Sequence, residues 1–358
     1  MVVLPTRPRS GARAGAAATV ALARLTAALV EEARLHPAGL RAAASAITSA
    51  LATLRAVTTV EARVAGVPVP GPLVITGLHR TGTSLLQELL AEHPGLRVPR
   101  LWELMFPVGA GSFAERARSY VDEYHRAAPG FRAIHRLDPD RPEECHRLTA
   151  PTFLSEIYAL RYRVPGYLAW LDTQDHTPAY RFHRAALRAI LHRSADQART
   201  VVLKCPFHLW HTDTLAAVYP HARIVRLHRD PVTALVSGCS LVATIRRARS
   251  HAVDPAEIGA FWLDRTTTAV ERMLTSGVAG LPVLDVRQDE LGRDPIGVAS
   301  RVCDFAGVPA TSQALQRMRG YLAGAGGVGA HRYRPEDYGL DPDRLAGRFA
   351  AYRARFGV

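Results

Sequence analysis

The sequence predicts an α/β protein in which a parallel β-sheet is flanked by helices. Short apolar runs rich in β-branched residues have the character of buried strands, and stretches with helical spacing separate them. These runs are residues 73–76, 201–203, 223–227 and 282–286. Strands that alternate with helices favour a parallel sheet, and ligands on such sheets bind at the carboxyl ends of the strands. The loops that begin at residues 77, 204 and 228 are therefore expected to converge.

Two helical additions are expected beside the sheet. The N-terminal stretch is rich in Ala, Leu and Arg at helical spacing, and Pro37 with Gly39 mark a break between two helices. We expect residues 1–69 to form a helical arm and residues 70–358 to form the main domain. Within it, the stretch from about 104 to 200 is longer than an ordinary crossover and contains many aromatic residues. It predicts a helical insertion that builds an acceptor pocket, although such aromatic residues also suit a plain core.

The composition indicates a globular protein with a small anionic ligand. The chain has 358 residues, 48% of them apolar, and a formal net charge of +13. This charge attracts polyanions, but the arginines are scattered, without a basic run interleaved with aromatic residues. We therefore expect no nucleic-acid partner. Because no apolar run approaches the roughly 18 residues of a membrane helix, we expect a soluble, cytoplasmic protein without a membrane partner; a signal peptide at the N-terminus is a minor alternative.

The cysteines and histidines predict reduced thiols and no metal site. His208 and His211 stand three residues apart, but no further ligand at zinc-site spacing accompanies them. The cysteines are widely separated and form no C-x-x-C pair, which is typical of a reducing compartment. They are Cys145, Cys205, Cys239 and Cys303.

The segment ITGLHRTGTS, residues 75–84, predicts a phosphate-binding loop. An apolar run ends at Gly77, and hydroxyl residues after Gly82 open a helix whose backbone N–H groups can bind an anion. A nucleotide triphosphatase carries a lysine at the position of Thr83, where it neutralises the β and γ phosphates. Here the cation is Arg80, inside the loop. A planar guanidinium at that position suits charge that develops beside a single phosphate.

The segment RIVRLHRDPVTALVSGCS predicts a second anion contact. A strand ends at Arg229 and Asp230, Pro231 opens the next helix, and Ser237 follows within it. Arg229 and Ser237 could both reach one phosphate. A strand-end arginine paired with Asp230 is the alternative.

Together the two segments resemble the sulfotransferases that use 3′-phosphoadenosine 5′-phosphosulfate (PAPS). The family binds the 5′-phosphosulfate with a loop that contains a lysine or arginine, a serine or threonine, a glycine and two further hydroxyl residues. It binds the 3′-phosphate with an Arg-Asp-Pro or Arg-Asn-Pro segment that is followed by a serine. The matching residues are Arg80, Thr81, Gly82, Thr83 and Ser84 for the first, and Arg229 with Ser237 for the second. LKCPFHL, with Lys204, is similar to the family's K-x-P segment, and HRYRPEDYGLD, with Arg332, to its C-terminal basic loop. The sequence departs from cytosolic members at Leu85 and Gln288.

The resemblance implies transfer of the sulfuryl group from PAPS to a hydroxyl or phenol of a small molecule, by in-line displacement and without a metal. Arg80 and Lys204 would stabilise charge on the bridging oxygen. Glu103 in RLWELMFP is the preferred general base from its spacing to Arg80, and His208 is the second candidate. The segment DRPEECH ranks lower. Glu143 and Glu144 could orient an acceptor, but a helix N-terminus with Pro142 in its first turn is the preferred interpretation.

Two other functions stay open from the sequence. One is a small-molecule kinase that uses ATP, with Asp285 as the magnesium ligand at a strand end. The other is a non-catalytic basic protein that binds nucleic acid. The sequence predicts neither the acceptor nor the oligomeric state.

Overall fold

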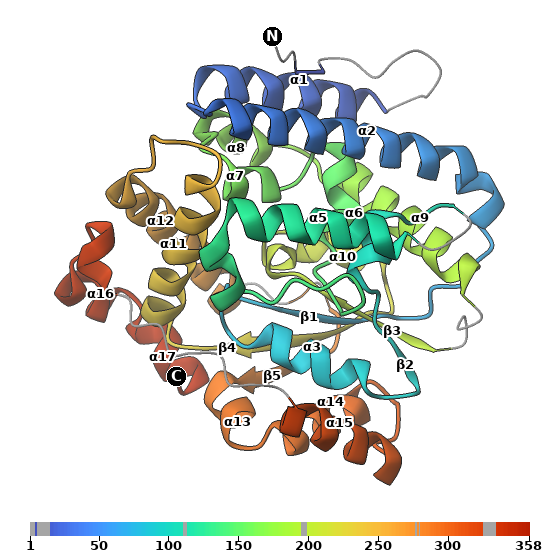
Figure 1. Ribbon diagram of the computed structural model, residues 1–358. Coiled ribbons are helices and arrows are strands. Elements are labelled where there is room, and N and C mark those ends of the chain that lie inside the picture. The colour runs from blue at the N-terminus through green and yellow to red at the C-terminus, as the bar shows by residue number, and fades with distance from the viewer. Residues whose placement is uncertain are drawn as a thin grey trace.

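A five-stranded parallel sheet forms the centre of the protein (Figure 1). The computed structural model describes residues 4–5, 15–109, 113–194, 199–275, 278, 280–324 and 334–358. The strand order is β2-β3-β1-β4-β5, and each neighbouring pair is parallel. The strands are β1 Leu73–Gly77, β2 Leu96–Arg97, β3 Thr200–Lys204, β4 Arg223–His228 and β5 Val283–Arg287. The four expected strands and the parallel sheet are confirmed, whereas the two-residue β2 carried too little pattern to be predicted.

Side chains alternate between two cores across the sheet. Leu73 and Ile75 of β1 belong to one buried cluster, and Val74 between them belongs to the other. This follows from the two-residue period of a strand, which sends successive side chains to opposite faces. Burial on both faces is the reason why the strands read as continuous apolar runs.

Helices cover both faces of this sheet. The smaller core lies under α3 Thr83–Ala91, α13 Gln288–Arg293, α14 Pro295–Phe305 and α15 Ser312–Gly324. The larger core lies under α9 Thr177–Arg193, α10 Thr212–Val218, α11 Pro231–Arg247 and α12 Pro255–Thr275. The short helices η3 Pro206–Trp210, η4 Pro335–Tyr338, α16 Pro342–Arg348 and α17 Ala350–Phe356 complete this side.

The stretch between β2 and β3 is helical. It contains α4 Leu101–Met105, α5 Ala114–Ala127, η1 Pro129–Ala133, α6 His146–Thr149, η2 Ala150–Thr152, α7 Ile157–Arg161 and α8 Pro165–Leu171, followed by α9. Its tyrosines 158, 162, 167 and 180 are buried in the larger core. They therefore stabilise the insertion by packing, which was the plainer of the two interpretations of its aromatic residues.

The N-terminal arm consists of α1 Ala16–Glu31 and α2 Pro37–Val64. Pro37 occupies the first turn of α2, and the His36 ring accepts a hydrogen bond of 2.9 Å from the Gly39 N–H. A Cβ on Gly39 would lie 1.9 Å from the Arg249 carbonyl oxygen, so only glycine allows α2 to approach this segment. The arm packs on α8, α9 and η2 of the insertion (Figure 1).

Among the described residues, α2 is the one helix long and apolar enough to cross a membrane by length and composition, with a mean hydropathy of 1.2 over its best window. It contacts α9 through a buried stripe, so this single helix is weak evidence for a membrane span.

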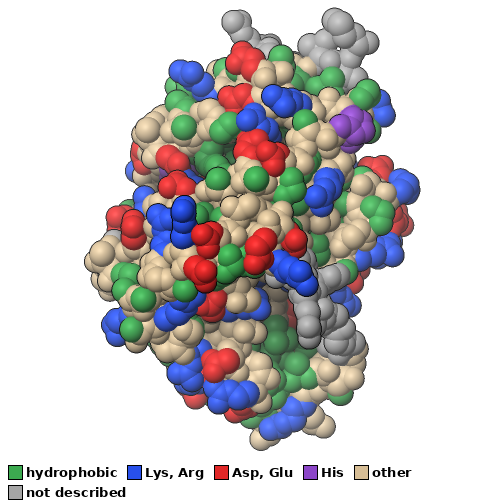
Figure 2. Space-filling model, turned by 90° about the vertical axis from the view of Figure 1, so that its left-hand side faces the viewer, with side chains coloured by type: hydrophobic (Ala, Val, Ile, Leu, Met, Phe, Trp, Pro, Cys, Tyr) green, Lys and Arg blue, Asp and Glu red, His purple; other side chains and the backbone are tan. Residues whose placement is uncertain are grey.

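The surface carries both signs of charge. Figure 2 shows basic and acidic side chains intermixed on the face it presents, without one continuous basic area. On that face the net positive charge of the chain is not gathered into a stripe of the kind that follows a nucleic-acid backbone.

Candidate active site

The loop between β1 and α3 has the shape of an anion-binding loop. Gly77 has φ +151° and Gly82, the N-cap of α3, has φ +92°. A Cβ on Gly77 would lie 2.5 Å from the Leu227 carbonyl oxygen, so the loop needs glycine there. The Thr81 hydroxyl is buried and donates a 2.9 Å hydrogen bond to the Leu78 carbonyl, which closes the turn. Helix α3 then begins at Thr83 with its N–H groups directed at the loop.

Arg80 is held in the left-handed region, with φ +68°. For a residue with a side chain, this conformation costs about 1–2 kcal/mol. Its Nη1 donates a 2.7 Å hydrogen bond to the Ile134 carbonyl, and its Nε lies 3.4 Å from the Ser237 hydroxyl. These contacts from the insertion and from α11 stabilise the strained residue. Strained backbone of this kind clusters at binding loops.

The second predicted segment joins the first at this point. Arg229 Nη1 donates a 2.8 Å hydrogen bond to the Arg80 carbonyl. Asp230 is engaged elsewhere: it accepts 2.8 Å from the Thr233 N–H as the N-cap of α11 and pairs with Arg353 at 2.7 Å. Burial lowers the pKa of the Arg229 guanidinium, and a bound anion would offset that desolvation.

Lys204 supplies a cation to the loop from the neighbouring strand. It ends β3 and is buried, and its Nζ lies 2.8 Å from Glu144 Oε1 and 3.3 Å from the Ser84 hydroxyl. Burial alone would lower the pKa of Lys204, but Glu144 outweighs it and raises that pKa. Burial alone would likewise raise the pKa of Glu144, but Lys204 holds it well below its usual range. Both groups are therefore charged at neutral pH.

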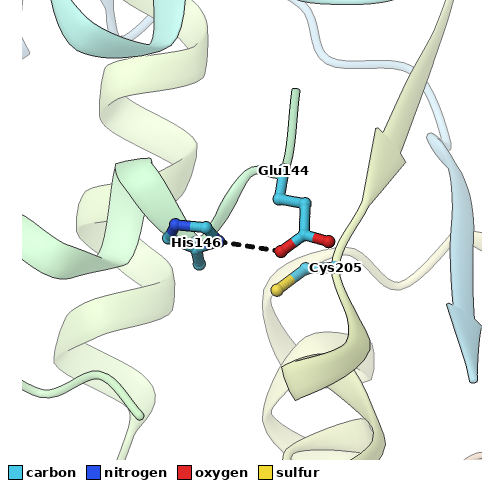
Figure 3. Close-up of side chains that lie close together, drawn as sticks. All are labelled: Glu144, His146 and Cys205. Carbon is cyan, nitrogen blue, oxygen red and sulfur yellow. Dashed lines mark hydrogen bonds and ion pairs between the residues drawn. The ribbon is translucent and has the colours of Figure 1, made fainter. Parts of the chain in front are cut away.

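A backbone hydrogen bond of the neighbouring residue positions Glu144 beside Lys204. The next residue, Cys145, donates its N–H to the Lys204 carbonyl at 2.9 Å, which fixes the segment beside the end of β3. Figure 3 shows the Glu144 carboxylate directed toward His146, 3.1 Å from its Nδ1, with the Cys205 sulfur beside them. Helix α6 begins at His146, the last residue of this segment, so Glu144 precedes the helix and Pro142 does not occupy its first turn as expected. The available signal was two adjacent carboxylates in the stretch expected to build the acceptor pocket, since buried charges need partners.

The two bases preferred from the sequence lie in other surroundings. Glu103 is buried in a capping box of α4, where it accepts 2.9 Å from the Arg100 N–H and pairs with Arg97. Among the described residues, the hydrogen bonds of its carboxylate go to these groups and not to the loop. The Glu103 side chain therefore performs the structural role of a helix cap.

His208 is buried in η3, with both ring nitrogens engaged. Nδ1 lies 2.7 Å from the Tyr180 hydroxyl and Nε2 lies 3.1 Å from Cys145 Sγ. Burial lowers the pKa of His208 to about 3, so the ring is neutral. All four cysteines, Cys145 included, are free and buried.

Three further positions were singled out from the sequence: Gln288, Leu85 and Arg332. Gln288, the first residue of α13, lies beside Gly82, because a Cβ on that glycine would be 3.5 Å from Gln288 Cγ. Leu85 packs against the smaller core. Arg332 lies outside the described residues.

The magnesium ligand that a kinase would require is engaged in a surface network. Asp285 lies within the edge strand β5 and accepts from Arg226 Nε at 2.7 Å and from His228 Nε2 at 2.7 Å. Burial would raise the pKa of Asp285, but these two partners hold it well below its usual range. The kinase interpretation is thereby not supported.

Around β1, where the strand order reverses, the loops after β1, β3 and β4 meet as expected. The site thus has a glycine loop at the start of a helix and a lysine that comes from the adjacent strand β3 and not from the loop itself. These features define an α/β protein with a phosphate-binding loop that lacks its own lysine. Residues 72–312 match the sequence model described as the Sulfotransferase family. The chain belongs to the sulfotransferase family.

Similar proteins include mycobacterial sulfotransferases. The chain is 27% identical over 263 residues to omega-hydroxy-beta-dihydromenaquinone-9 sulfotransferase Stf3 of Mycobacterium bovis, an alignment that spans 70% of this chain and 66% of that protein. The crystal structure of sulfotransferase STF1 from Mycobacterium tuberculosis has a TM-score of 0.80 and 28% identity, covering 95% of this chain and 93% of that one. Sulfotransferase STF9 from Mycobacterium avium has a TM-score of 0.85 at 24% identity, covering 96% and 92%, and shares the fold.

Proposed function

We propose that this protein transfers the sulfuryl group of PAPS to a hydroxyl of a small-molecule acceptor. The observation that carries the proposal is the meeting of the Arg80 loop, Arg229 and Lys204 around β1 in a chain that belongs to the sulfotransferase family. A nucleotide with two separate anionic ends requires two cationic contacts, and this site offers both.

The donor would lie across the end of β1. Its 5′-phosphosulfate would accept from the backbone N–H groups at the start of α3 and from the hydroxyls of Thr83 and Ser84. Its 3′-phosphate would lie against the Arg229 guanidinium and the Ser237 hydroxyl. Gln288 beside Gly82 would then contact the nucleoside.

In the reaction, the acceptor oxygen forms a bond to sulfur while the bond from sulfur to the bridging oxygen breaks. Adenosine 3′,5′-bisphosphate leaves, and the negative charge grows on its 5′-phosphate. Lys204 and Arg80 stabilise this charge, as preorganised cations do in phosphoryl transfer. Metal-free transfer is part of the proposal, because Lys204 already supplies the cation beside Ser84.

We assign the acceptor proton to Glu144 in preference to Glu103 and His208. The Glu144 carboxylate is ionised, and it shares Lys204 with the donor site. As Lys204 turns toward the leaving phosphate, it withdraws its charge from Glu144 and raises the basicity of that carboxylate when the acceptor loses its proton. Glu103 is a helix cap, and the neutral His208 ring has both nitrogens engaged.

The acceptor is expected to have an apolar or aromatic body. The His79 ring, inside the loop, contacts Phe207 and Trp262 with centroid distances of 5.3 and 5.2 Å. The indole N–H groups of Trp210 and Trp262 are buried without a hydrogen-bond partner among the described residues. Donors of this kind favour a ligand with oxygen acceptors. The relative from Mycobacterium bovis is named for a hydroxylated menaquinone, which combines these features.

The test is incubation of the full chain with sulfur-labelled PAPS and a panel of hydroxylated aromatic and isoprenoid compounds. We expect labelled sulfate ester from the wild type, and a 10² to 10⁴-fold lower kcat from E144Q, typical of a lost general base. E143Q is the matched control, because Glu143 forms its ion pair with His135, and glutamine keeps an oxygen that can accept the hydrogen bond from the Glu144 N–H. Transfer of label from γ-labelled ATP, with none from PAPS, would contradict the proposal.

A further inference from the structure

A second cluster of ligand-type side chains lies outside the phosphate loop. Glu156, His176 and His211 each offer one nitrogen or oxygen, and these atoms all lie within 4.8 Å of one another. Glu156 pairs with Nε2 of His211, and the two imidazole rings stack with centroids 3.8 Å apart. We call these residues the His-Glu triad. Glu156 and His176 are buried, and His211 is nearly so.

The hydrogen bond of His176 leaves a lone pair available. Its Nε2 lies 3.2 Å from the Leu171 carbonyl oxygen. A carbonyl oxygen only accepts, so Nε2 carries the proton and Nδ1 is the bare nitrogen. A backbone carbonyl that fixes the tautomer in this way is the usual outer contact of a histidine that binds a metal.

We propose that the His-Glu triad binds one divalent metal ion of the zinc type, through one nitrogen of each histidine and one carboxylate oxygen. Two histidines and a glutamate are a known ligand set for zinc, which leaves a fourth position for water. Ligands about 2.0–2.2 Å from a tetrahedral ion lie roughly 3.4 Å apart, so the three ligand atoms, which lie within 4.8 Å of one another, have to move closer together to hold the ion. When the metal binds, it takes the Nε2 lone pair of His211 in place of the contact with Glu156, the ring keeps one proton on Nδ1, and any second proton leaves to solvent.

A cavity gives the ion a path to this site. It has a volume of about 520 Å³, and its lining includes His176 and His211, the carboxylates of Asp172, Asp175 and Asp213, and the guanidiniums of Arg226 and Arg272. An ion can therefore reach the two histidines of the triad through this cavity without unfolding of the chain.

The other cluster of this kind, Glu144, His146 and Cys205, is less suited to a metal. The ammonium of Lys204 already lies 2.8 Å from the Glu144 carboxylate and would repel a cation. Burial also raises the pKa of the Cys205 thiol well above its usual range, so the thiolate ligand is not formed.

A metal at the triad would connect three helix starts. Glu156, His176 and His211 are the N-cap residues of α7, α9 and α10. His211 also ends η3, which follows Lys204 with one residue between them. The metal would therefore stabilise the segment that carries the cation of the phosphate loop, while taking no part in transfer.

The test uses the full chain without an affinity tag, purified without chelator. Metal content is measured by mass spectrometry, and cobalt is titrated into the metal-free protein. We expect about one zinc per chain in the wild type and in C205S, and a cobalt spectrum with ligand-field bands but no thiolate charge-transfer band. H176Q and E156Q should lose at least about 100-fold in cobalt affinity, given that even outer contacts are worth 10 to 100-fold. H192A, which alters an exposed histidine at the end of α9, should bind like the wild type.

A second readout separates binding from folding. Added zinc should raise the Tm of the metal-free wild type and leave that of H176Q unchanged, whatever the starting stability of the variant. The proposal is overturned if the wild type binds neither zinc nor cobalt. It is equally overturned if C205S loses the metal while H176Q retains it.

Discussion

The pair of Lys204 and Glu144 permits a quantitative test of the site. Lys204 is 1% exposed, Glu144 is 20% exposed, and the two charges lie 2.8 Å apart. Breaking a buried pair by removing one partner costs about 3–5 kcal/mol. Because Glu144 is partly exposed and His146 can compensate its charge, we take the lower end, about 3 kcal/mol, for K204M. For E144Q, which retains an acceptor for the ammonium, we expect about 2 kcal/mol.

The double variant K204M/E144Q should lose only about 3 kcal/mol, because no unpaired charge remains in it. The two substitutions are therefore coupled by about 2 kcal/mol in the free energy of unfolding. Urea unfolding of the four proteins, followed by far-ultraviolet circular dichroism, measures this coupling. The exposed pair of Arg293 and Asp289 serves as the control cycle and should show no measurable coupling. If the effects of K204M and E144Q add to within about 0.5 kcal/mol, the two side chains do not form the pair described.

Three further outcomes follow from the site. R80A should lower kcat/KM by at least about 100-fold. R80K should restore little of this loss, because an ammonium lacks the planar fork that contacts both Ile134 and Ser237. Full rescue by lysine would refute a role that requires the guanidinium. G82A should weaken binding of adenosine 3′,5′-bisphosphate, since alanine disfavours φ +92°, and wild-type affinity would show that the loop tolerates it. Burial lowers the pKa of His208 to about 3, whereas in the unfolded chain a histidine is protonated below about pH 6.5, so the free energy of unfolding falls with falling pH. At pH 5 we expect His208 to contribute a loss of about 2 kcal/mol relative to pH 7, and H208Q to lose less. Urea unfolding at pH 7 and pH 5 measures both losses.

The sheet was predictable because its strands are buried on both faces and read as apolar runs. The convergence of the loops at Arg80, Lys204 and Arg229 followed from one rule, that parallel strands end at the same edge. The short β2 was missed because two residues carry no periodicity.

The surroundings of the candidate general bases were harder to predict, because spacing along the chain does not show which partner a side chain meets in space. The spacing of Glu103 from Arg80 along the sequence suited a general base. In the structure, however, Arg97 at the end of β2 pairs with Glu103, which caps α4. Glu144 is fixed by the backbone bond between Cys145 and the end of β3, which joins segments about sixty residues apart. The His-Glu triad is likewise assembled from three separate turns.

Binding of adenosine 3′,5′-bisphosphate, measured by calorimetry without added magnesium, is the most direct test of the central claim that Arg80 and Arg229 bind the two ends of one nucleotide. We expect one tight site in the wild type and at least about 100-fold weaker binding in R229A. Adenosine 5′-monophosphate, which lacks the 3′-phosphate, should bind wild type and R229A alike. Equal affinity of R229A and wild type for the bisphosphate, or a preference for ATP with magnesium, would contradict the account.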